Sequence, residues 1–89
     1  MQVPKLKVLV EAGAVRDAEV TYAADAAGWT VAITDASRRD ERREGLERQR
    51  GGVRAFATLD AVARTLTRLG LPAFRVDARG RVEEEAEPP

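Results

Sequence analysis

Arginines form the densest group of chemically capable side chains in this chain. Between residues 37 and 54, seven arginines meet four acids, which leaves a local charge of +3. A guanidinium group is a planar, bidentate donor that suits phosphate or carboxylate partners. The interleaved acids weaken attraction to a nucleic-acid backbone. The candidate residues for contact with a nucleic acid or a protein partner are Arg42, Arg43, Arg48, Arg50 and Arg54.

Catalytic chemistry has few residues to draw on. The chain contains no histidine and no cysteine, which excludes His-based triads, Cys nucleophiles, disulfides and the usual zinc ligands. Ser37 is the one serine, and it has no histidine to activate it. The pair Gly51-Gly52 has neither the lysine of a P-loop nor the dinucleotide fingerprint. We therefore expect no enzyme activity, no cofactor and no metal ion.

Charge and aromatic content favour protein contacts over direct nucleic-acid binding. The chain has 15 basic and 15 acidic residues, and the last eight residues hold four of the acids. The remaining body therefore carries 15 − 11 = +4, a weak field for steering a polyanion. The aromatic residues are expected in the core, not as stacking platforms for bases. The alternative is a small DNA-binding regulator that uses residues 38–54, and two-fold self-association is a further option.

The N-terminal residues must take one of two forms. Val3, Leu6, Leu9 and Val10 follow the spacing of one helical face, and Gly13 suits a helix end. Leu6, Val8 and Val10 also alternate as in a strand. Residues 4–12 are therefore a helix or a strand, and the helix is favoured.

The middle and end of the chain predict a hairpin, a helix and a last strand. Alternation on both sides of Gly28 predicts two antiparallel strands within 15–35. Thr58 can cap a helix that ends at Gly70, and residues 73–77 read as a strand before a turn at Arg79-Gly80. The expected core is Leu6, Leu9, Val20, Trp29, Val31, Ile33, Phe56, Leu59, Val62, Leu66, Leu69, Phe74 and Val76.

The charged stretch 36–52 is ambiguous, because Leu46 is its one large apolar residue. It could be an exposed strand, a helix laced by ion pairs, or a mobile loop. We favour a poorly ordered loop that leads into an edge strand near 44–48. The expected plan is one α+β domain over 1–82, followed by a disordered acidic tail over 83–89.

Three stretches of the sequence resemble a known family. They are residues 4–15 (PKLKVLVEAGAV), residues 54–61 (RAFATLDA), and Leu69-Gly70 followed by residues 74–77 (FRVD). Over roughly 2–78, the chain resembles the small accessory proteins of bacterial plasmids and integrative elements that are described as ParC-like or partition-associated. These motifs form the fold, so they assign no functional residue. The arginine-rich segment and the acidic tail depart from the resemblance.

The resemblance implies a bacterial protein that works beside a partition ATPase and a DNA-binding partner protein. It implies an adaptor that acts through protein contacts and has no catalytic role. No apolar run approaches the length of a membrane span, and no secretory signal is present. We therefore expect a cytoplasmic location.

Overall fold

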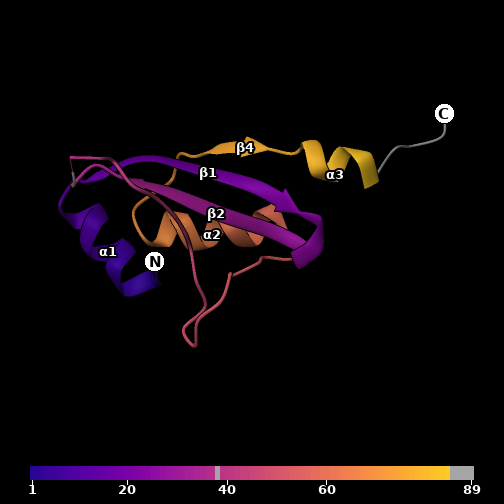
Figure 1. The fold of residues 1–89 in the computed structure, drawn as a ribbon, viewed down its shortest axis with the longest axis horizontal. Coiled ribbons are helices and arrows are strands. Elements are labelled where there is room, and N and C mark those ends of the chain that lie inside the picture. Colours follow the sequence, from indigo (N-terminus) through magenta and orange to yellow (C-terminus); the bar gives the residue numbers. More distant parts are fainter. Residues whose placement is uncertain (38, 85–89) are drawn as a thin grey trace.

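The computed structural model describes residues 1–37 and 39–84, and the side chains as far as residue 81. The chain forms a small α+β fold with helices beside a four-stranded mixed sheet, as predicted (Figure 1). Its elements are α1 (Val3–Glu11), β1 (Val15–Ala23), the 3₁₀ turn η1 (Ala24–Ala26), β2 (Gly28–Asp35), β3 (Arg43–Gly45), α2 (Leu59–Arg68), β4 (Arg75–Asp77) and α3 (Arg79–Glu84).

The sheet has the strand order β3-β2-β1-β4. The predicted hairpin is confirmed, because β1 and β2 pair antiparallel in a register that sets Val20 opposite Val31. β3 adds antiparallel to β2, whereas β4 returns parallel to β1. The helix α2 lies between β3 and β4 in sequence, so it supplies the crossover that a parallel pair requires.

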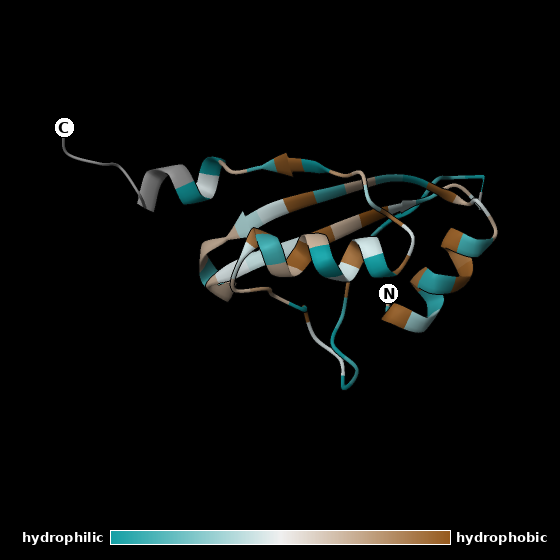
Figure 2. Cartoon of the chain, turned by 180° about the vertical axis from the view of Figure 1, so that it is seen from behind, coloured by the Kyte–Doolittle hydropathy of each residue, from teal (hydrophilic) through white to brown (hydrophobic). Residues whose placement is uncertain are grey.

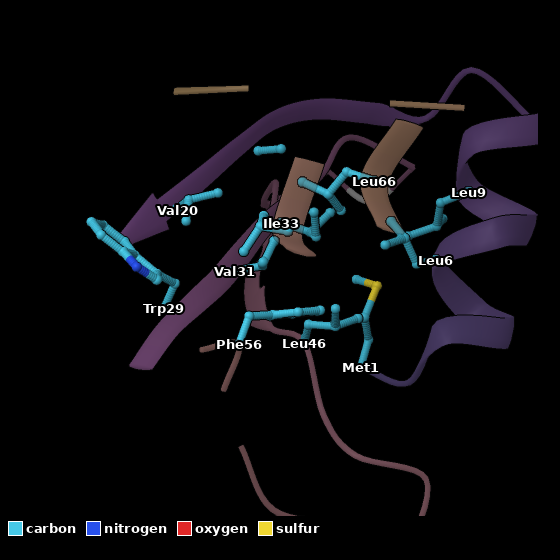
Figure 3. Close-up of a cluster of buried hydrophobic side chains, with 12 residues drawn as sticks. Met1, Leu6, Leu9, Val20, Trp29, Val31, Ile33, Leu46, Phe56 and Leu66 are labelled. Carbon is cyan, nitrogen blue, oxygen red and sulfur yellow. The ribbon is translucent and has the colours of Figure 1, made fainter. Parts of the chain in front are cut away.

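One apolar cluster joins the helices to one face of the sheet (Figure 3). Alternation puts the buried residues of β1 and β2 on this face. The helices α1 and α2 pack their buried leucines and valine against it. The buried apolar residues are Met1, Leu6, Leu9, Ala18, Val20, Trp29, Val31, Ile33, Leu46, Phe56, Val62 and Leu66.

The helical interpretation of the N-terminus is confirmed, and the strand alternative is wrong. Gly13 adopts a left-handed φ of 67° just after α1. The N–H of Ala14 donates to the carbonyl of Leu9 at 2.8 Å, and the N–H of Gly13 donates to the carbonyl of Val10 at 3.0 Å. These two bonds form a Schellman motif, which satisfies the last carbonyls of the helix.

Both predicted ends of α2 are confirmed. The Thr58 hydroxyl accepts the N–H of Ala61 at 3.1 Å, which caps the first turn. At the other end, the N–H of Leu71 donates to the carbonyl of Leu66 at 2.8 Å. Gly70 between them has a φ of 95°, a conformation that glycine adopts without strain.

The charged stretch 36–52 contains the edge strand β3, two residues shorter than the expected 44–48 and shifted to Arg43–Gly45. The ion-paired helix considered for it is wrong. Leu46, which was absent from the expected core, is 1% exposed. Its N–H donates to the carbonyl of Val31 at 2.8 Å, and its carbonyl accepts the N–H of Arg54 at 3.0 Å. The mobility expected for this stretch stays a prediction.

The expected core is wrong mainly at its C-terminal end. Val76 is 45% exposed, because β4 is the sheet edge beside β1 and extends past the cover of the helices. Leu59, Leu69 and Phe74 are half-buried at the margin of the cluster. Met1, which was not expected in the core, is buried there.

The turn expected at Arg79-Gly80 is instead the start of α3. Asp77 accepts the N–H of Arg79 at 3.1 Å, and this bond satisfies a free donor at the helix start. The Arg81 guanidinium lies 5.3 Å from the centre of the Tyr22 ring, which fixes α3 against the end of β1. Of the expected acidic tail, 83 and 84 end α3, and 85–89 lie outside the described residues.

Candidate partner-binding surface

One face of the sheet carries no helix among the described residues. The helix α2 lies over the strands in Figure 2, whereas the opposite sheet face is turned to the reader in Figure 1. We call this second surface the open face. Strand alternation and register assign to it Asp17, Glu19, Thr21, Thr30, Ala32, Thr34, Arg43, Gly45, Arg75 and Asp77.

Four charged side chains form an alternating chain of ion pairs across the open face. Arg43 on β3 donates from Nη2 to Glu19 Oε1 at 2.5 Å. Arg75 on β4 donates from Nη1 to the second oxygen of Glu19, Oε2, at 3.1 Å. Arg75 also holds Asp17 with two bonds, from Nη2 at 2.6 Å and from Nε at 3.0 Å. Three strands are therefore tied together in the order β3, β1, β4.

Small side chains on β2 and β3 make this chain of ion pairs sterically feasible. β2 lies between β3 and β1, so the Arg43 side chain must cross it to reach Glu19. Ala32 is the residue of β2 that pairs with Glu19, and its partner on β3 is Gly45. Ala32 has only a methyl side chain and Gly45 has none, so the side chain of Arg43 can lie across the sheet.

The ion pairs shift the ionisation of their members. The hydrogen bond from Arg75 is the main cause that lowers the pKa of Asp17, and the Asp17 bond is the main cause that raises the pKa of Arg75. Next to them, the hydrogen bond from the Arg79 side chain lowers the pKa of Asp77 to about 2. Asp17, Arg75, Asp77 and Arg79 therefore stay charged at neutral pH, and the positive and negative charges of these neighbours offset each other.

No aromatic side chain lies on the open face. Tyr22 and Trp29 meet edge to face on the opposite side, with ring centres 5.3 Å apart. Phe56 is buried there as well, and Phe74 packs against the margin of the same cluster. The chain has no other aromatic residues, so this face lacks the platforms on which single-stranded bases stack.

The five arginines predicted as contact residues do not form one site. Arg43 belongs to the ion-pair chain of the open face, and Arg42 precedes it, with its side chain making no hydrogen bond or ion pair to the described residues. Arg48, Arg50 and Arg54 instead belong to a separate protruding turn, which we call the arginine turn (residues 48–54; Figure 1).

The arginine turn is closed by its own backbone. The N–H of Arg48 donates to the carbonyl of Gly52 at 2.9 Å, and Gly51 and Gly52 have φ values of 91° and 81°. The guanidinium of Arg54 lies 4.7 Å from the centre of the Phe56 ring. Arg50 is exposed, and its side chain makes no hydrogen bond or ion pair to the described residues.

Sequence reasoning missed the acidic and C-terminal members of the ion-pair chain. The alternation of Asp17 and Glu19 with apolar residues marks them as outward-facing. Their partner Arg75 is 56 residues or more away, and it comes alongside only through the parallel return of β4. Local patterns do not carry that pairing.

Other chemistry of the described residues is limited. Ser37 donates both its N–H and its hydroxyl to Asp35 Oδ1, which closes the turn after β2. Within residues 1–37 and 39–84, no cluster of acidic side chains could hold a metal ion. In the same range, no helix has the length and apolar character needed to cross a membrane.

Comparison with known proteins identifies one family. A family model described as ParC-like matches residues 1–85, which include the open face and the arginine turn. The comparisons with curated proteins and with solved structures find no match. The match confirms the resemblance noted in the sequence.

Proposed function

Because the chain belongs to the ParC-like family, we propose that it is a non-enzymatic adaptor in the maintenance of a plasmid or mobile element. In this proposal, it binds a protein partner through the open face. The observation that carries the proposal is the sheet face that no described helix covers, on which Arg43, Glu19, Arg75 and Asp17 alternate in charge. The candidate partners are a partition ATPase and a DNA-binding partition protein.

The charge pattern suits a folded protein better than a polyanion. Both arginines of the open face already contact carboxylates, so few cations remain free there to neutralise phosphates. A partner with its own alternating charges can exchange pairs with this chain, so that each charge keeps an opposite charge beside it in the complex. Such complementarity selects the partner and its orientation more than it adds affinity.

The side chains between the charges allow close approach. Thr21, Thr30 and Thr34 are half-buried and offer short hydroxyl groups along two central strands. Thr30 donates to the carbonyl of Thr21 at 3.2 Å, which keeps part of this surface fixed before a partner arrives. A preordered surface loses less entropy on binding than a mobile one.

Site-specific cross-linking tests the proposal, because the chain has no cysteine and one introduced thiol is unique. Thr34→Cys carries a photoreactive group on the open face, and Thr67→Cys carries it on the exposed side of α2 as the matched control. Each variant is mixed with the purified partition ATPase and with the purified DNA-binding protein of the same element. We expect a product from Thr34→Cys with one of them, and equal yields from both variants would refute the proposal.

A DNA-binding regulator is the second candidate function, and one observation favours it. Arg48, Arg50 and Arg54 lie on a single protruding turn, and the guanidinium of Arg50 has no partner among the described residues. A gel-shift titration at low salt tests this role with Arg48→Gln/Arg50→Gln as the comparison. Tight, salt-sensitive binding that the double variant loses would promote this candidate over the adaptor.

A further inference from the structure

We propose that two copies of this chain pair through their β4 strands, antiparallel and about a two-fold axis, so that their sheets become continuous. The inference concerns an edge of the sheet and does not rest on the role proposed for the open face. The two edges of the sheet, β3 and β4, differ in what covers them.

The N-terminal residues of the same chain occupy the C-terminal end of the β3 edge. The Met1 amino group donates to the carbonyl of Gly45 at 2.6 Å, and the N–H of Glu47 donates to the carbonyl of Met1 at 2.7 Å. Lys5 on α1 adds an ion pair to Glu44 at 3.2 Å. These contacts occupy the C-terminal end of the β3 edge and hinder strand addition there.

The β4 edge is uncovered in the described part of the chain. The backbone groups of residues 74–77 make no hydrogen bond to any described segment other than β1. Figure 1 shows no element beyond β4 at this margin of the sheet. Val76 is 45% exposed and points to the helix side, where its paired neighbour Val20 is fully buried. A free strand edge with an exposed apolar residue is a template for pairing with another strand.

The sequence of this edge is complementary to itself. In an antiparallel pair centred on Val76, each Arg75 lies opposite Asp77 of the other copy, and the two valines face each other. Phe74 then lies opposite Ala78 on the valine side. Both of these residues are half-buried at the margin of the core. The pair therefore places opposite charges together on one face and apolar groups together on the other.

The charged groups can make these contacts from where they are. Arg75 is 61% exposed while it holds Asp17, so part of its guanidinium already faces solvent. Asp77 is held by Arg79, whose side chain is 90% exposed and can move aside. A two-fold arrangement forms both charge pairs at once, and it closes at two copies without leaving a free β4 edge.

Charge exchange at the two positions tests the pairing by sedimentation over a concentration series. Asp77→Arg sets two arginine–arginine contacts across the axis, and Arg75→Asp sets two contacts between carboxylates. We expect each variant alone to dimerise about tenfold more weakly than the unchanged protein, because two attractive pairs become repulsive. An equimolar mixture of the two variants restores opposite charges at every contact and should associate at the original strength.

Two further variants keep the test decisive if Arg75→Asp fails to fold beside Asp17. Val76→Lys puts like charges at the centre of the axis and should abolish association. Val8→Lys changes a valine on α1 that is 62% exposed and should leave association unchanged. A protein that stays monomeric throughout the series would overturn the proposal. So would equal weakening by both lysine variants, or normal dimerisation of Asp77→Arg.

Discussion

Replacing Leu46 by alanine should destabilise the protein strongly, although its neighbours in the chain are charged. Leu46 is 1% exposed and packs among Met1 and Phe56 in the core (Figure 3). Removing a buried leucine side chain costs about 2–5 kcal/mol, through lost transfer energy and the cavity left behind. A chain of this size has a total stability of about 4–13 kcal/mol, so the loss is a large share.

Thermal denaturation followed by circular dichroism measures this loss. At about 4–8 °C per kcal/mol for a domain of this size, a loss of about 3 kcal/mol lowers Tm by about 12–24 °C. Val53→Ala is the matched control, since Val53 lies in the same segment and is 60% exposed. Its Tm should stay within a few degrees of the original. Equal Tm values for the two variants would refute the placement of Leu46 in the core.

Two other predictions concern the sheet and its charges. The hydrogen bond from Arg79 depresses the pKa of Asp77 to about 2 in the folded protein. This contribution to stability is therefore present above about pH 4 and fades as pH falls toward 2. Replacing Arg79 by alanine should raise the pKa of Asp77 again, which an NMR titration of the variant measures. An unchanged pKa would count against the ion pair. Gly28→Ala should lower the free energy of unfolding, because its Cβ would lie 2.7 Å from the Phe56 carbonyl oxygen. Urea denaturation should give Gly28→Ala a clearly lower free energy of unfolding than Gly45→Ala, whose Cβ would meet nothing closer than 3.9 Å. A lower free energy of unfolding for Gly45→Ala would contradict the packing.

Elements governed by local patterns could be predicted from the sequence. The cap at Thr58 and the left-handed Gly70 define α2, and alternation around Gly28 defines the hairpin. Each of these signals lies within a few residues of the structure that it specifies. Short-range hydrogen bonding and side-chain periodicity are therefore sufficient to identify them.

Features that depend on distant contacts could not be predicted. Leu46 looks isolated in its segment, and its burial requires Met1 and Phe56 to close around it. Val76 alternates like a core residue, but it lies on an edge strand beyond the helices. The exposure of Val76 depends on the edge of the sheet that β4 joins, and no local pattern encodes which edge that is.

The candidate site was predicted only in part for the same reason. The local charge marks Arg43 as a contact candidate, but its partner Glu19 lies on a strand two places away in the sheet. Arg48 and Arg50 are close to Arg43 in sequence and lie on a separate turn. Charge density along the chain therefore identified arginines without showing which of them share a surface.

Amide shift mapping by NMR tests whether the open face binds a protein partner. The isotope-labelled protein is titrated with the partition ATPase and with the DNA-binding partition protein of its own element. We expect one of them to shift the amide signals of Thr21, Thr30 and Thr34 and to leave those on the exposed side of α2 unchanged. Shifts confined to α2 or to the arginine turn would contradict it, as would an unchanged spectrum with both proteins.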